Sequence, residues 1–133
     1  MIVLAGCLLV SLIGGGCALR ETEYVYGEAV VETVDIAILE SFPVQIRAVL
    51  RGTVSDACTE MDSITAQREG DTFTLVVRTR RPVDALCAQV LTPYEATKGL
   101  DVLGLPAGIY TVVAGDATAS FELAVDNLPQ DEP

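Results

Sequence analysis

The chain of 133 residues contains no histidine and no tryptophan, and it has only eight Lys and Arg against nineteen Asp and Glu. Without histidine there is no imidazole to act as a general base or a zinc ligand, which excludes the commonest hydrolytic and zinc chemistry. A formal net charge of −11 repels phosphate backbones and anionic lipid surfaces. We therefore expect no nucleic-acid partner and no electrostatic attachment to a membrane.

Charge is also absent from the beginning of the chain. Residues 2–19 (IVLAGCLLVSLIGGGCAL) include 13 apolar residues among 18, and the first charged residue is Arg20. An apolar run that ends in small residues is typical of an export signal, and this one resembles a bacterial lipoprotein signal. We expect residues 1–17 to be a signal peptide, with lipidation at Cys17. The alternatives are lipidation at Cys7, plain secretion and an uncleaved anchor, and all of them place the folded part outside the cytoplasm, membrane-anchored or secreted.

The remainder of the chain shows the period-two alternation of half-buried β-strands. Apolar side chains recur at every second position in residues 34–38 and 44–51. Gly70-Asp71 and Gly115-Asp116 each fit a two-residue hairpin turn. The predicted cross-strand pairs of the first hairpin are Glu69 with Thr72, Ala66 with Leu75, Ile64 with Val77 and Glu60 with Arg81. Those of the second are Tyr110 with Phe121 and Val112 with Ala119.

Residues 87–94 and 99–103 are predicted as two further strands, and Leu105-Pro106-Ala107-Gly108 as a type I turn. Seven to eight strands with no amphipathic helix predict an all-β fold, a single immunoglobulin-like antiparallel β-sandwich. We assign residues 1–17 to the signal, 18–33 to an acidic spacer, 34–126 to the sandwich and 127–133 to a disordered tail.

Two cysteines, Cys58 and Cys87, lie outside the signal. An even pair in an exported chain indicates a disulfide. A redox site would favour a C-x-x-C pair, and a zinc site would need more ligands.

The segments ILESFPVQIRAVLRG, DACTEMDSITAQREGDTFTLVVRTRRPVDALCAQVLTPYE and LDVLGLPAGIYTVVAGDATASFEL resemble a family of small uncharacterised bacterial envelope proteins. Many of these carry lipoprotein signals, and they contain one immunoglobulin-like β-sandwich. The resemblance spans residues 34–127, and its most specific elements are the surroundings of the two cysteines and the Leu-Pro-Ala-Gly segment. It implies export, a disulfide and the sandwich fold, and it implies no activity.

No catalytic constellation is recognisable. The nearest pair of carboxylates, Glu60 and Asp62, is interpreted as a solvated edge that prevents intermolecular strand pairing. There is no nucleophile motif, no phosphate loop and no calcium loop. We expect neither an enzyme nor a bound cofactor or metal.

We expect instead a binding or structural module of the cell envelope that contacts proteins or polysaccharide at the cell surface. The alternative is an exported inhibitor or accessory domain of an extracellular enzyme such as a peptidase. Some immunoglobulin-like peptidase inhibitors bind through loops at one end of the sandwich, and Arg81-Pro82 weakly resembles part of such a loop. Candidate contact loops are residues 80–85 and 92–99. The possible binding surface consists of Arg47, Arg51, Arg78, Arg80 and Arg81. The other interpretation of these arginines, which we favour, is that they form exposed ion pairs with acidic neighbours. The oligomeric state is left open.

Overall fold

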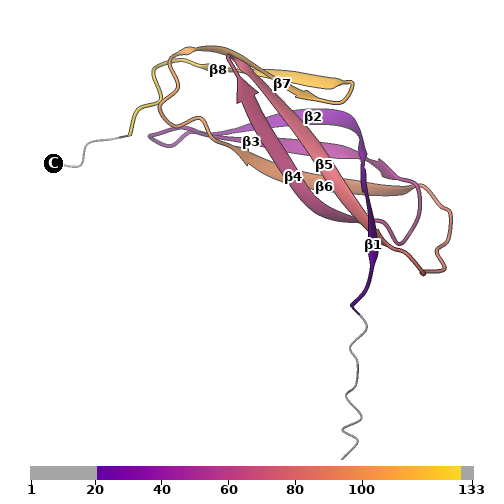
Figure 1. Ribbon diagram of the computed structural model, residues 1–133. Helices are drawn as coiled ribbons and strands as arrows, with labels where there is room; N and C mark the ends of the chain where they lie inside the picture. Colours follow the sequence, from indigo (N-terminus) through magenta and orange to yellow (C-terminus); the bar gives the residue numbers. More distant parts are fainter. Residues whose placement is uncertain (1–20, 130–133) are drawn as a thin grey trace, which may run out of the picture.

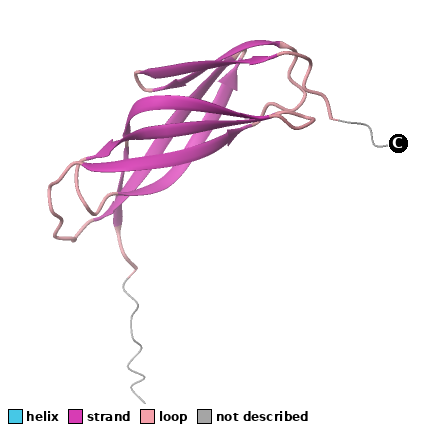
Figure 2. Cartoon of the chain, turned by 180° about the vertical axis from the view of Figure 1, so that it is seen from behind, coloured by secondary structure: helices cyan, strands magenta, loops and turns pink. Residues whose placement is uncertain are grey.

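The computed structural model describes residues 21–129, so the expected signal peptide, with Cys7 and Cys17, and residues 130–133 lie outside the described part. That part contains eight β-strands and no helix (Figures 1 and 2). The strands are β1 (Tyr24–Glu28), β2 (Val30–Leu39), β3 (Gln45–Val54), β4 (Glu60–Glu69), β5 (Thr72–Pro82), β6 (Thr92–Leu100), β7 (Gly108–Ala114) and β8 (Ala117–Leu123). None of residues 21–129 belongs to a helix long and apolar enough to span a membrane.

The strands form two sheets, which confirms the predicted β-sandwich. One sheet has three strands in the order β2-β3-β6, and the other has five strands arranged around β5. Along one side β5 pairs with β4, and along the other it pairs with β1 and then with β7. The β5–β7 pairing is parallel and covers only residues 72–74 of β5, whereas all the other pairings are antiparallel.

The core lies between the two sheets, where the alternation of each strand directs its apolar side chains. In β3 the buried positions are the even ones from Ile46 to Val54, and in β5 they are the odd ones from Phe73 to Thr79. Val112 of β7 is fully buried, and Phe121 of β8 is 4% exposed. Because side chains on a strand alternate between faces, the residues between these positions form the two outer faces of the sandwich.

The first hairpin has the predicted register from its turn to Ser63. Its pairs include Glu69 with Thr72, Ala66 with Leu75 and Ile64 with Val77. A register shift between Met61 and Ser63 then places Glu60 opposite Arg80 instead of Arg81. One extra residue on β4 accounts for the difference, because a bulge opposes two residues to one on the partner strand.

The second hairpin matches its prediction throughout. Tyr110 faces Phe121 and Val112 faces Ala119. The rings of Tyr110 and Phe121 stack with centroids 5.4 Å apart. Both hairpin turns use glycine at positive φ, 62° at Gly70 and 59° at Gly115, as a primed turn requires.

Between the hairpins the prediction of two strands was wrong, because a single strand, β6, spans Thr92–Leu100. Residues 87–91 are not in a strand, and residues 92–99 are therefore not the expected contact loop. Pro93 and Gly99 suggest a loop, yet β6 lies at the edge of its sheet, where proline is tolerated.

The chain also turns earlier than expected before β7. Leu105 N–H donates to Val102 O at 3.2 Å, and Gly104 has φ 83°, so the turn covers residues 102–105 instead of 105–108. Glycine is favoured at that third turn position because φ is positive there.

The sandwich extends beyond residues 34–126. Part of the segment expected as a spacer forms β1 and the first residues of β2. Asn127, expected to begin the tail, is only 4% exposed. The described chain begins at one end of the sandwich and finishes at the other (Figures 1 and 2).

Candidate functional site

The disulfide predicted between Cys58 and Cys87 is present, with a Cα–Cα distance of 5.6 Å. It joins the segment before β4 to the loop of residues 83–91 that connects β5 to β6. We call the part of the sandwich around this bridge the disulfide end. Chain connections that lie at one end of a sandwich are where binding residues usually occur.

Asp56 organises the backbone beside the disulfide, a role that the sequence pattern did not reveal. Its Oδ1 accepts hydrogen bonds from the N–H of Cys58 (2.9 Å), the N–H of Thr59 (2.8 Å) and the hydroxyl of Thr59 (2.9 Å). Arg81 Nε lies 3.2 Å from Oδ2, without the alignment of a hydrogen bond. The Asp-x-x-Thr spacing is the only local signal that could have suggested this turn.

The electrostatics of Asp56 favour its charged form. Burial by itself would raise the pKa, since Asp56 is only 7% exposed. The hydrogen bonds from Thr59 and Cys58, together with the positive charge of Arg81, outweigh burial and hold the pKa below its ordinary value. Asp56 is therefore a structural anion.

The five arginines predicted as a binding surface occupy different faces. Arg47 and Arg51 lie on the outer face of the three-stranded sheet. Arg51 bridges Asp35 (2.5 Å) and Glu95 (3.0 Å), and the hydrogen bond to Glu95 contributes most to raising the pKa of Arg51. Arg81, which points toward Asp56, lies on neither outer face.

Arg78 and Arg80 share a surface with two tyrosines. On the outer face of the five-stranded sheet, the Arg80 guanidinium lies 4.5 Å from the ring centre of Tyr24, and that of Arg78 lies 5.9 Å from the ring centre of Tyr26. We call these four residues the tyrosine–arginine strip. Tyr26 is 53% exposed, so the strip is open to large ligands.

Glu60 holds one member of this strip in place. Arg80 Nε donates to Glu60 Oε1 at 2.7 Å, and this hydrogen bond raises the pKa of Arg80. Glu28, which is paired with Arg78 across the sheet, adds a second carboxylate nearby. The face therefore carries both signs of charge beside two aromatic rings. The sequence pattern missed it because both tyrosines fall in the segment expected as a spacer.

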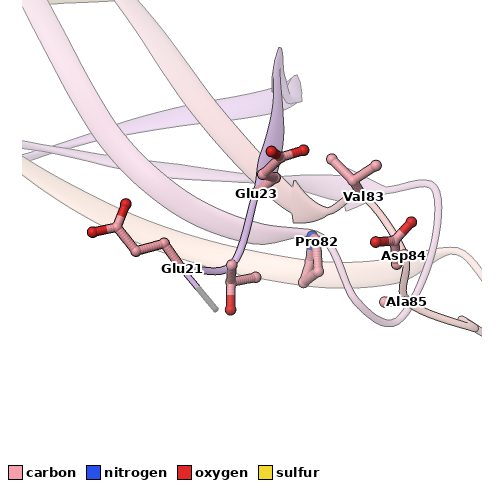
Figure 3. A pocket seen from close by; sticks show the side chains of 7 residues that line it. Glu21, Glu23, Pro82, Val83, Asp84 and Ala85 are labelled. Atoms are coloured by element: carbon pink, nitrogen blue, oxygen red, sulfur yellow. The ribbon is translucent and has the colours of Figure 1, made fainter. Parts of the chain in front are cut away.

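Two hollows lie at opposite ends of the molecule. One, of about 590 Å³, is lined by residues 21–23 at the start of the described chain and by residues 82–85 (Figure 3). The other, of about 510 Å³, is mainly apolar and is lined by residues that include Ile38, Phe42 and Val125. Phe42 is 73% exposed there.

Asn127 fixes the loops at the end opposite the disulfide. Its side chain accepts from Val44 N–H (2.8 Å) and donates to Val44 O and Val102 O, both at 3.0 Å. Its backbone N–H donates to Leu105 O at 2.8 Å, and its backbone carbonyl accepts from Gly104 N–H at 2.7 Å. Five hydrogen bonds at one residue join three connecting segments, and we call this the Asn127 end.

One group of potential metal ligands occurs among residues 21–129, and it consists of Asp56, Cys58 and Cys87. The sulfur atoms of the two cysteines are bonded to each other, so neither supplies the thiolate that a metal would bind. Asp56 is already occupied by its hydrogen bonds. The arrangement is that of a covalently fastened loop.

Comparison with known proteins supports the fold described above. The model of the ORF11 beta-sandwich domain family matches residues 48–123. The chain belongs to this family. It is 31% identical over 94 residues to an uncharacterised 10.2 kDa protein in the HgiCIIM 5′ region of Herpetosiphon aurantiacus, a match that covers 70% of this chain and 98% of that protein.

A second Herpetosiphon aurantiacus protein, an uncharacterised 10.2 kDa protein in the HgiBIM 5′ region, is 32% identical over 83 residues, which are 62% of this chain and all of that protein. No solved structure matches the chain significantly. The expected resemblance to small β-sandwich proteins is thus confirmed, while the lipoprotein and envelope character of this chain stays a prediction.

Proposed function

We propose that this member of the ORF11 beta-sandwich domain family is an exported, non-catalytic binding module. It is attached to the cell envelope or secreted, and it contacts polysaccharide or protein at the cell surface. Two features support export: the charge-free apolar segment of residues 2–19 and the disulfide between Cys58 and Cys87. Disulfides persist in oxidising compartments and are rare in the cytosol. In the form that we favour, Cys17 carries the lipid.

The tyrosine–arginine strip is the observation that carries the binding role. A sugar ring has an apolar face of C–H groups and a rim of hydroxyls. The rings of Tyr24 and Tyr26 offer flat apolar surface to the first, and guanidinium and carboxylate groups offer hydrogen bonds to the second. Because Arg78 and Arg80 lie beside Glu28 and Glu60, the strip suits an uncharged polysaccharide better than an anionic one.

The absence of catalysis is part of the proposal. The titratable groups with shifted pKa values in residues 21–129 are Asp56, Arg51, Arg80 and Tyr94. The shifts of the first three maintain the charged form. The pKa of Tyr94 is raised, mainly by burial and to a smaller extent by the negative charge of Glu32. The Tyr94 hydroxyl donates a hydrogen bond to Val30 O at 2.7 Å. No member of this set is adjusted toward neutral pH, as a general acid or base would be.

No observation favours the inhibitor alternative. A wedge-like inhibitor would need Arg81-Pro82 on a protruding loop. Arg81 instead faces Asp56, and Pro82 ends β5, where it pairs with Tyr24 of β1.

Co-sedimentation with insoluble polysaccharides tests the proposal. We expect the full chain, kept soluble in a non-ionic detergent, to bind at least one of the uncharged polysaccharides cellulose and chitin. The double variant Tyr26→Ala/Arg78→Gln should bind at least about tenfold more weakly, since truncating an aromatic residue that dominates a binding surface costs about 2 kcal/mol or more. Arg47→Gln changes an arginine that is also exposed but lies on the opposite outer face, and it is the matched control. Equal binding by all three proteins, or by none, would contradict the proposal.

A further inference from the structure

The loop of residues 83–91 (VDALCAQVL) presents apolar side chains to solvent at the disulfide end. Asp84 is its only charged residue. Four of its large apolar side chains are exposed: Val83 (44%), Leu86 (102%), Val90 (59%) and Leu91 (72%). Adjacent exposed apolar side chains mark an interaction surface.

A disulfide and two hydrogen bonds hold the loop of residues 83–91 in the conformation that exposes these side chains. Cys87 at its centre is bonded to Cys58, and Ala57 N–H donates to Ala88 O at 3.1 Å. Thr92, where β6 begins, donates from its hydroxyl to Val90 O at 3.0 Å. The bridge and these hydrogen bonds hold the middle of the loop against the segment before β4. Leu86 and Leu91 consequently stay exposed instead of folding onto the core.

The position of the loop indicates what it contacts. Val83 N–H donates to Glu23 O at 2.9 Å, and residues 21–23 line the same hollow as residues 82–85 (Figure 3). The apolar segment finishes at Leu19, four residues before Glu23. At no more than about 3.6 Å per residue, Leu19 and Glu23 are at most about 14 Å apart, and Cys17 is within about 22 Å. If either residue sits at a membrane, the loop lies within reach of the headgroups, a layer about 5 to 8 Å thick on each side.

We propose that the loop of residues 83–91 inserts Leu86, Val90 and Leu91 into the lipid bilayer that holds the N-terminal segment. This inference rests on the membrane-attached form of the proposed function. The occupant is lipid because the loop begins beside Glu23, only four residues after the apolar segment ends in the sequence. Its attraction is apolar and not electrostatic, since the chain has a net charge of −11 and the loop has no basic residue. Insertion is therefore expected on zwitterionic lipid. Because the Asn127 end lies opposite the loop, insertion directs that end away from the membrane.

The natural chain contains no tryptophan, so one introduced tryptophan reports its own surroundings without background. We would compare Leu86→Trp with Leu103→Trp in the full chain, reconstituted into phosphatidylcholine vesicles with and without brominated acyl chains. Leu103 is the matched control, because it is also an exposed leucine in a connection (55%) but lies at the far end of β6. The nine residues of β6 separate the two ends by about 30 Å. Circular dichroism and the intact disulfide verify the fold of both variants.

For Leu86→Trp we expect the tryptophan fluorescence to shift to shorter wavelength in vesicles and to be strongly quenched by the brominated chains. For Leu103→Trp we expect neither effect. If the chain floats with the vesicles while both tryptophans stay unquenched, insertion of the loop is refuted and membrane attachment stands. If both are quenched equally, the sandwich lies flat and end-on insertion is refuted. If the chain does not float with the vesicles at all, attachment fails and the inference fails with it.

Discussion

Removal of the bridge between Cys58 and Cys87 should destabilise the sandwich severely. The perturbation is the double variant Cys58→Ser/Cys87→Ser, which leaves no thiol in residues 21–129. The cysteines are 29 positions apart. Closing a loop of this size lowers the entropy of the unfolded chain, and the bridge stabilises the fold by about 3.6 kcal/mol on that account. A typical domain has only about 5 to 15 kcal/mol of stability.

Thermal and urea unfolding followed by far-ultraviolet circular dichroism measure this loss. For a folded part of this size the midpoint temperature should fall by about 15 °C. The wild type in excess reducing agent should unfold like the variant, and the variant itself should not respond to the reducing agent. This role of the bridge would be refuted if the double variant lost less than about 1 kcal/mol of unfolding free energy. It would also be refuted if the reducing agent left the unfolding of the wild type unchanged.

Three further predictions concern residues that hold the fold. Gly52→Ala should lower the free energy of unfolding by about 1 to 3 kcal/mol through overpacking, because a Cβ there would lie 2.1 Å from Val30 O. Gly99→Ala is the control, because a Cβ there meets nothing within 4 Å. Its free energy of unfolding in urea should stay within about 0.5 kcal/mol of the wild-type value. Asn127→Ala should cost about 3 kcal/mol, because it leaves the partly buried N–H and carbonyl of Val44 and the buried carbonyl of Val102 without partners; an unchanged urea midpoint would contradict this. The pKa of Asp56 is lowered in the fold, so its contribution to the free energy of unfolding is complete above its unfolded pKa of 3.8 and is lost as pH falls through the folded value. The wild type should therefore lose stability below about pH 4 relative to Asp56→Asn. If the stabilities of the two proteins changed in parallel with pH, the role of the Asp56 charge would be refuted.

Much of the fold could be predicted from the sequence because its strongest signals are local. Alternating apolar residues place β3 and β5, and the Gly-Asp turns set the registers of both hairpins. The disulfide follows from an isolated pair of cysteines. Each of these features is determined by residues that are close in the chain or few in number.

The missed features depend on contacts between distant residues. Strand β1 joins the sheet through backbone pairing with β5, which requires no apolar pattern. Asn127 is buried by loops that are 25 and 83 residues away in the sequence. The tyrosine–arginine strip exists only because β1 lies beside β5, so five arginines that look alike in the sequence are separated onto different faces.

The claim on which the rest depends is that this protein acts outside the cytoplasm with its bridge closed. The most direct test is to alkylate intact cells that make it naturally with a membrane-permeant thiol reagent, and then to digest the protein without reduction and analyse it by mass spectrometry. We predict one linked peptide pair containing Cys58 and Cys87, free of the reagent and separated by reduction. Recovery of both cysteines as singly alkylated peptides, from protein in the cytosolic fraction, would contradict the account.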